Sequence, residues 1–270
     1  MWRRLLCAFG RVGLLIMAVT ALFVVLAPTC TNLLFRRKFS QIPGMYTVVQ
    51  PLADYTASDA PGTTLSFDGF EFDVPWKSGY KTRTANKRVQ GFEFATGQSA
   101  LLWVAENQDG LLTEAANDQS MHMEGFRSAF PKLIKQSAYD QYSTLLNITP
   151  ASIHPFGPID ENARATTLLM LKAIAPPGDI KSGAYSFKLP DKRGFQLGNP
   201  SATSHVCVEV FDLNGHNLEI FLSEKVGTPR ITQPEVNRII QSLHTVPERA
   251  SGERKPKDVA LARRPQSSQD

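Results

Sequence analysis

The residues best placed to do chemistry lie in two strand-like stretches near the carboxyl end of the chain. Alternating apolar residues mark both stretches: Val206, Val208 and Val210, then Leu218, Ile220 and Leu222. The residues between them share the opposite face of each strand. If the two strands pair with their apolar stripes on one face, Glu209 stands opposite Glu219, with Cys207 and Phe221 beside them.

Two opposed carboxylates repel each other, so this pair needs a Lys or Arg, a bound cation or a raised pKa. A thiol and two carboxylates could hold a divalent metal, although hard and soft ligands rarely suit the same ion. His205 lies about 13 Å from Glu209 along the strand, too far to share an ion. The sequence favours the simpler interpretation, a solvent-facing or salt-bridged strand surface. We therefore predict no metal ligands, with Cys207, Glu209 and Glu219 as the one alternative cluster.

The pairing of these strands depends on the loop between them. Both stripes share a face only if the loop has an odd length. The segment Leu213-Asn214-Gly215 supplies a three-residue loop, with Gly215 left-handed in a bulge. A two-residue Asn214-Gly215 turn would put the stripes on opposite faces. We predict the three-residue loop.

Other chemical motifs are missing from the sequence. It has no nucleophile elbow, H-E-x-x-H, P-loop or dinucleotide fingerprint, and its five histidines show no ligand spacing. Met121-His122-Met123 carries soft ligands that suit copper, but adjacent positions on a helix diverge by about 100°. Met123 also aligns with Phe126 as core. We predict no catalytic residue and no cofactor, and lean toward a protein that is not an enzyme.

An early hairpin is well marked. Residues 65–74 alternate around Asp68-Gly69, which favours a type I′ turn that pairs Phe67 with Phe70 and Leu65 with Phe72. Further strands are predicted at 89–95 and 99–105.

Helices are predicted in the middle and at the end of the domain. An apolar stripe of Met123, Phe126 and Phe130 ends at Pro131, and Ser137 caps a second helix. Asp160 is predicted to cap a third, 161–175, whose apolar run 168–171 implies burial on several sides. Thr232 and Glu235 form a capping box for a last helix that docks on the sheet through Val236, Ile239, Ile240 and Leu243.

The chain is therefore predicted to have an α+β fold of antiparallel sheets packed by helices, preceded by a single N-terminal transmembrane helix. The expected divisions are an anchor at 1–38, a tether at 39–63, a globular domain at 64–244 and a disordered charged tail at 245–270. Within the domain, 70–77 resembles 185–192, and each is followed by Gly-Phe, at Gly91-Phe92 and Gly194-Phe195. This predicts a possible internal duplication, 64–148 and 184–244. Alternatively, strands that end before proline simply look alike.

The order of these elements resembles that of PsbP-like domains. The resemblance rests on an aromatic-rich strand that closes in Pro75-Trp76, on later antiparallel strands and on a last helix. It implies an antiparallel sheet covered by helices, and a role in binding or assisting partners without catalysis. The long helical middle, 111–175, departs from that pattern.

The first 38 residues predict attachment to a membrane. An apolar run extends from Val12 to Phe35, interrupted only at 28–32. A bilayer core is crossed by about 20 apolar residues, because no water there satisfies the backbone. The basic residues of the two flanks, which can lie among headgroups, are Arg3, Arg4, Arg11, Arg36, Arg37 and Lys38.

Two alternatives compete with this uncleaved signal anchor. A cleaved secretory signal needs a small-x-small site, which residues 25–29 lack. A lipoprotein signal would acylate Cys30, but Thr29 stands where Gly, Ala or Ser is expected. Both flanks carry three basic residues, so charge does not set the orientation. The short amino-terminal tail favours a single-pass protein of the cell membrane with an extracytoplasmic (periplasmic) body.

Charge distribution restricts the partners. The chain carries a net charge of +4, but the anchor contributes six positive charges and the tail two more, which leaves the body at −4. Nucleic-acid binding demands a basic surface on the folded domain, so no nucleic acid is expected. We predict a non-catalytic accessory or interaction domain of the cell envelope, which contacts the lipid bilayer and a protein or other envelope partner. The alternatives are an enzyme of unrecognised class and a small-ligand or metal sensor that uses the second face of hairpin 205–223. The leading hypothesis also predicts no cluster of ionisable groups with perturbed pKa.

Overall fold

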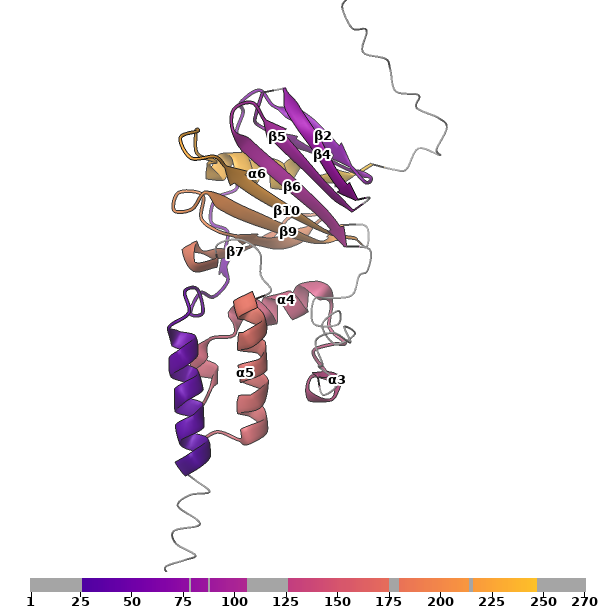
Figure 1. Cartoon of the computed structure of the whole chain (residues 1–270). Helices are drawn as coiled ribbons and strands as arrows, with labels where there is room; N and C mark the ends of the chain where they lie inside the picture. Colours follow the sequence, from indigo (N-terminus) through magenta and orange to yellow (C-terminus); the bar gives the residue numbers. More distant parts are fainter. Residues whose placement is uncertain are drawn as a thin grey trace, which may run out of the picture.

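Alternating apolar residues build two β-sheets whose inner faces share one core (Figure 1). The computed structural model describes residues 26–77, 79–86, 88–105, 126–174, 180–213 and 216–246. The strands are β1 (Gln50–Pro51), β2 (Thr63–Phe67), β3 (Phe70–Val74), β4 (Tyr80–Asn86), β5 (Val89–Phe94), β6 (Gln98–Ala105), β7 (Ala184–Lys188), β8 (Arg193–Leu197), β9 (His205–Leu213), β10 (His216–Glu224) and β11 (His244–Thr245).

The larger sheet has eight strands in the order β1-β7-β8-β9-β10-β6-β5-β4, and the smaller has the order β11-β3-β2. All neighbouring strands are antiparallel except β1 and β7, which are parallel. The predicted α+β class is confirmed.

The helices are α3 (Phe126–Ala129), α4 (Ala138–Asn147), α5 (Ile159–Ile174) and α6 (Gln233–Ser242), with short 3-10 turns η2 (Pro150–Ser152) and η3 (Ile180–Ser182). Apolar residues of α6 complete the core between the sheets, whereas α4 packs on the opposite face of the larger sheet (Figure 1). Each face of β9 is therefore covered by different elements.

The early hairpin has the predicted register. Phe67 pairs with Phe70 and Leu65 with Phe72. Asp68 and Gly69 have φ values of 47° and 80°, as a type I′ turn requires. The strands predicted at 89–95 and 99–105 are β5 and β6.

The late hairpin confirms the predicted stripes but corrects the loop. Val206 pairs with Leu222, and the register shifts between His216 and Leu218. Leu213 pairs with His216, so Leu213 belongs to β9 and not to the loop, while 214 and 215 lie outside the described residues. The shift in register between His216 and Leu218 therefore supplies the extra residue that the predicted loop was expected to supply.

The helix caps are mostly as predicted. The Ser137 side chain accepts a hydrogen bond from the Asp140 backbone N–H, and the capping box of Thr232 and Glu235 is present. Asp160 is not the cap of α5, because the Pro158 carbonyl accepts the first helical bond from Asn162 N and Asp160 lies in the first turn. In the run 168–171, Leu168, Leu169 and Leu171 are buried, as the predicted burial on several sides requires, and only Met170 is exposed.

An N-terminal helix spans 26–40 and runs beside α5, away from the sheets (Figure 1). The polar stretch 28–32, expected to interrupt the apolar run, is helical. Residues 1–25, which carry most of the predicted anchor, lie outside the described residues, as do Met123 and most of the tail. Among the residues that are described, no helix has both the length and the apolarity needed to cross a bilayer.

The predicted tether, 39–63, packs against the folded body instead. Phe39, Met45 and Leu52 are buried, and β1 pairs with β7. Lys172 of α5 fastens this segment, because its buried ammonium donates to the carbonyls of Thr47 (2.7 Å), Leu146 (2.6 Å) and Ile148 (2.8 Å). A lysine has three donors, and all three find acceptors here.

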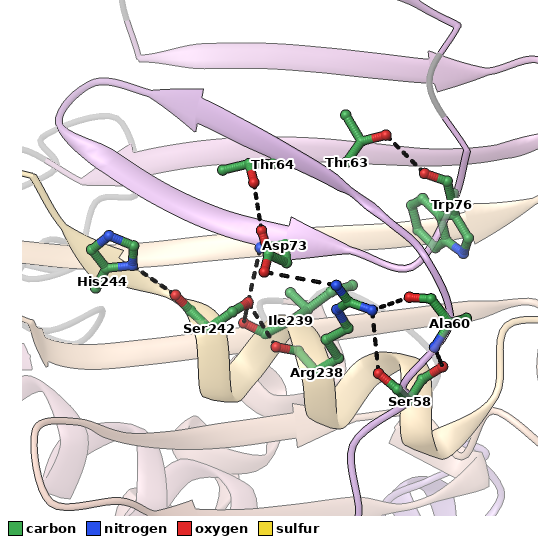
Figure 2. A network of polar contacts seen from close by, with 10 residues as sticks. All are labelled: Ser58, Ala60, Thr63, Thr64, Asp73, Trp76, Arg238, Ile239, Ser242 and His244. Atoms are coloured by element: carbon green, nitrogen blue, oxygen red, sulfur yellow. Dashed lines mark hydrogen bonds and ion pairs between the residues drawn. The ribbon is translucent and has the colours of Figure 1, made fainter.

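Polar side chains of α6 hold the later part of the same segment (Figure 2). Arg238 donates to the carbonyls of Ser58 and Ala60 and lies 3.8 Å from the Asp73 carboxylate. Ser242 Oγ accepts from the Asp73 backbone N–H at 2.8 Å. One helix therefore joins the small sheet to residues 54–60, since Asn237 of the same helix also donates to the carbonyls of Asp54 and Thr56.

The strands that carry the two similar segments of the predicted duplication lie in different sheets. Residues 70–74 form β3 of the small sheet, whereas 184–188 form β7 of the large one. The Gly-Phe strands that follow, β5 and β8, both lie in the large sheet, next to β6 and β9 respectively. The duplication stays a prediction.

These two Gly-Phe strands offer a matched test of packing. A Cβ added at Gly194 would lie 2.0 Å from the Glu209 carbonyl oxygen and 2.5 Å from the Phe187 ring, whereas one at Gly91 meets only ordinary contacts at 3.7 Å. We expect Gly194→Ala to lower the free energy of unfolding by about 2 kcal/mol or more, since close-packed backbone cannot yield. Gly91→Ala should change it by less than about 0.5 kcal/mol. Urea denaturation checks both, and equal effects would contradict the close approach of β8 and β9.

Candidate functional site

The predicted carboxylate pair is present on the second face of the late hairpin. Glu209 of β9 pairs with Glu219 of β10, and Cys207 pairs with Phe221. The part of this face around Glu209 is not solvent-facing, because α4 lies over it and places Tyr142 against Glu209, while Glu219 is half-buried. Sequence reasoning found the pairing from strand alternation, but it had no signal for the helix that covers it.

The four polar groups are in direct contact. Tyr142 Oη donates to Glu209 Oε1 at 3.4 Å, and the Cys207 thiol lies 4.0 Å from the same oxygen. One ligand atom from each of Cys207, Glu209 and Glu219 falls within 4.8 Å of the others. The cluster thus joins two carboxyls, a thiol and a phenol.

Burial makes this cluster unusual. Glu209 is only 9% exposed and Cys207 is fully buried. No described cationic side chain forms an ion pair with Glu209 or Glu219. The predicted solvent-facing or salt-bridged surface is therefore wrong for Glu209, which α4 covers without supplying a positive charge, whereas Glu219 is half-buried.

The pKa values show the consequence of that burial. Desolvation, with a further contribution from the charge of Glu219, raises the pKa of Glu209 well above its usual value, and the Tyr142 hydroxyl offsets part of this rise. Desolvation also raises the pKa of Glu219, against a lowering by the Cys207 thiol. Burial, followed by the nearby carboxylate of Glu209, raises the pKa of Tyr142 and of Cys207 well above normal. Each group is thus pushed toward its neutral form.

Two kinds of chemistry suit this arrangement. One carboxyl can hold a proton beside the charge of the other, because two like charges at close range resist ionising together. The two carboxyls can also bind a divalent cation after losing that proton, although the thiol mixes a soft ligand with two hard ones. The expectation that the domain has no cluster of perturbed ionisable groups is wrong.

An aromatic layer surrounds the cluster and was missed by sequence reasoning. Phe195 stacks on Tyr139 with ring centroids 4.7 Å apart, and Phe211 meets Phe195 edge to face at 5.9 Å. The Arg193 guanidinium lies 4.3 Å above the Tyr139 ring. These residues come from β8, β9 and α4, and only their joint placement on one face of the fold could have revealed them.

The other residues considered for chemistry do not join this cluster. His205 stacks on Phe221 with centroids 5.7 Å apart. Met121, His122 and Met123 lie outside the described residues. Cys30 is a free, exposed thiol in helix 26–40, remote in sequence from buried Cys207.

Among the described residues, cavities open elsewhere on the body, including the following two. The larger, of about 500 Å³, lies between residues 50–54, 199–201 and 230–233. The second, of about 290 Å³, is a hollow over β4, β5 and β6 that includes Leu101 and Phe221. Neither is lined by Glu209 or Glu219, so the carboxylate pair does not face either cavity.

The second hollow belongs to the part of the large sheet that α4 leaves uncovered. Trp103 is 47% exposed there and Leu101 is exposed beside it. Trp103 pairs with Glu219, and Leu101 pairs with Phe221, so this apolar strip adjoins the half-buried Glu219 of β10. We call Leu101, Trp103 and Phe221 the open sheet face.

Comparisons of the chain with protein-family models and with curated proteins found no significant match. The fold and the site are therefore interpreted from their own geometry.

The raised pKa values of Glu209 and Glu219 predict a specific dependence of stability on pH. The folded state holds these carboxyls protonated above the ordinary glutamate pKa of 4.5. It then binds more protons than the unfolded chain, so stability is full below 4.5 and falls as pH rises through the raised pKa. Because Glu219→Gln removes one of the two carboxylates, it should stabilise the protein relative to wild type at pH 8 and make the loss of stability with rising pH smaller. Urea denaturation between pH 4 and 9 measures this.

The control is Glu93→Gln, which removes a carboxylate from β5 that pairs with Arg83 at 3.3 Å near the surface. It should keep the pH profile of the wild type. Repeating the series with a chelator distinguishes a bound proton from a bound cation. If chelation lowers the stability of the wild type but not that of Glu219→Gln, the carboxylates bind a metal and the explanation by protonation is wrong.

Proposed function

We propose that this chain is a membrane-anchored, non-catalytic binding domain of the cell envelope, held by its amino-terminal segment with the body outside the cytoplasm. The sequence supports the anchor through the apolar run 12–35 with basic flanks and no acidic residue before Asp54. The resemblance to PsbP-like domains is consistent with binding or assisting a partner.

The observation that carries the proposal is the polarity of residues 26–35 in helix 26–40, which is reversed relative to a helix of a water-soluble protein, whereas Phe39 further along is buried. Polar Thr29 is buried and Asn32 is partly buried toward the body. Leu33, Leu34 and Phe35 instead point outward, with Leu34 60% exposed. Soluble helices bury their apolar stripe, whereas helices in lipid turn polar groups inward and apolar groups outward.

The same helix also contains a boundary. Its apolar outer residues stop at Phe35, and Arg36, Arg37 and Lys38 follow at once. Basic side chains at this place can reach headgroups while their stems stay on apolar surface. The proposed anchor therefore includes the first turns of the described helix and ends near residue 36.

A binding role is supported by the open sheet face. Its apolar strip is broad, includes an aromatic anchor in Trp103 and adjoins a hollow of about 290 Å³. Exposed aromatic residues beside a hollow are typical of protein–protein contacts. We expect a protein or another envelope component to bind there.

The anchor is tested on the full chain in its own membrane. Leu15→Asp with Val19→Asp should release the protein from membranes washed with alkaline carbonate, because each Asp at a helix centre costs roughly 3 kcal/mol on insertion scales. Wild type and the control Leu15→Ile with Val19→Leu should stay in the pellet. A reporter fused to the carboxyl end should be active outside the cytoplasm. Recovery of wild type as a soluble chain, shortened beyond position 27 and without an acyl group, would contradict the anchor.

The open sheet face is tested by photo-crosslinking in intact membranes. A benzophenone side chain at Leu101 should give a discrete adduct, and Trp103→Ser should weaken it, since Trp103 supplies the largest exposed apolar contact of the strip. The control position is Ser66, exposed on the small sheet. The same adducts from both positions would count against a specific binding face.

A metal or small-ligand sensor is the second candidate, favoured by the grouping of Cys207, Glu209 and Glu219 within 4.8 Å. The chelation arm of the pH experiment decides its metal version. An enzyme would need a cavity that reaches the carboxylates, and the two cavities described above are lined by other residues.

A further inference from the structure

Two large apolar side chains are held out into solvent where the chain enters α5. Phe156 is 83% exposed and Ile159 is 72% exposed. They are close in sequence, so their exposed surfaces come from one short segment, 156–159. Single exposed apolar residues are ordinary, but an adjacent pair of this exposure is typical of an interaction site.

The loop that carries Phe156 is firmly built. Buried Asn162 accepts from the His154 backbone N–H at 2.8 Å and donates to the carbonyls of His154 (2.7 Å) and Gly157 (3.4 Å). Gly157 N also donates to the His154 carbonyl at 3.0 Å. Because the backbone is fixed by these bonds, Phe156 is presented outward by a preorganised loop and little order has to be gained on binding.

This loop lies level with the outward leucines of helix 26–40. Asn32 Nδ2 donates to the Pro155 carbonyl at 3.4 Å, which joins the helix to the loop one residue before Phe156. Leu33 and Leu34 follow Asn32 directly in the helix and point away from the body. Helix 26–40 and α5 run side by side away from the sheets (Figure 1). If Leu34 lies in lipid, a neighbouring apolar loop at the same level reaches the same layer.

We infer that Phe156 and Ile159 form a second lipid contact, inserting shallowly into the bilayer surface beside the anchor. This inference rests on the proposed membrane attachment and deepens it. Asp160, Glu161 and Arg164 are exposed just beyond the pair and remain among the headgroups, which limits the depth of insertion. Because acidic residues adjoin the pair, the contact is apolar and does not require anionic lipid.

A single helix in a bilayer leaves the attached body free to rotate and tilt. A second contact on the neighbouring element removes much of that freedom. The lipid contact of segment 156–159 therefore fixes the orientation of the sheets, and of the open sheet face, relative to the membrane.

The test places an environment-sensitive fluorophore on the full chain, reconstituted in phosphatidylcholine vesicles. The labelled variants are Phe156→Cys and Ile159→Cys, in a background with Cys7→Ser and Cys30→Ser, since Cys207 is buried and stays unlabelled. The control is Val226→Cys, because Val226 is apolar and fully exposed in the turn after β10. Its neighbour Lys225 donates its backbone N–H to the Gly97 carbonyl, which places Val226 near the turn between β5 and β6. Lipids with a spin label on the acyl chain quench only a fluorophore that enters the bilayer.

We expect a blue shift and loss of most of the emission at 156 and 159, with neither change at 226. The effect should persist at high salt and without anionic lipid. If the protein floats with the vesicles but the label at 156 behaves like that at 226, the second contact is wrong and the anchor stands. If the protein does not float with the vesicles, the anchor itself fails. A blue shift that depends on protein concentration and not on the spin-labelled lipid would assign the pair to a second copy of the chain, which also overturns the inference.

Discussion

The pairing register of β9 with β10 is the constraint on which the rest of the structure depends. With Val206 opposite Leu222, the apolar stripes of both strands face the core shared by the two sheets and α6. The same register necessarily sets Glu209 against Glu219 on the other face. A slip by one residue would move every apolar side chain out of the core. The core therefore enforces the repulsion between the carboxylates, because the apolar contacts of two long central strands outweigh one unfavourable pair.

Close approach of the neighbouring elements then buries Glu209 and half-buries Glu219, which raises the pKa of both carboxyls. Gly194 lets β8 lie against the Glu209 backbone, since a side chain there would overlap the Glu209 carbonyl. The aromatic residues of β8 and β9 then form the apolar surface on which α4 packs, and Tyr142 of α4 donates a hydrogen bond to the carboxyl of Glu209. Ionising a carboxyl under this cover is costly without a cation, so the two groups hold protons above the pH at which free glutamates lose them. The packing of α4 and the protonation of the pair are thus linked.

Sequence reasoning succeeded where one local rule decides the structure. The Asp68-Gly69 turn and the alternation of β9 and β10 fixed both hairpin registers, and the capping box fixed the start of α6. It failed where distant elements decide. No residue near Glu209 in the sequence indicates that α4 covers it. The polar segment 39–63 has the composition of a tether, but Lys172 and Arg238 donate hydrogen bonds to its carbonyls and hold it on the body. The cap of α5 was misplaced because Pro158, which has no side-chain cap to recognise, supplies a backbone carbonyl instead.

The distribution of polar and apolar side chains in residues 26–35 of helix 26–40 also depends on the groups that surround each side chain. The body offers this helix polar partners at the Pro155 carbonyl, and Asn32 takes that inward place while Leu33 and Leu34 are left outside. In water this arrangement leaves the apolar area of Leu33 and Leu34 exposed. If the proposed anchor holds, the same arrangement would be the favourable one, since inward polar groups find hydrogen-bond partners in the protein and outward leucines meet acyl chains.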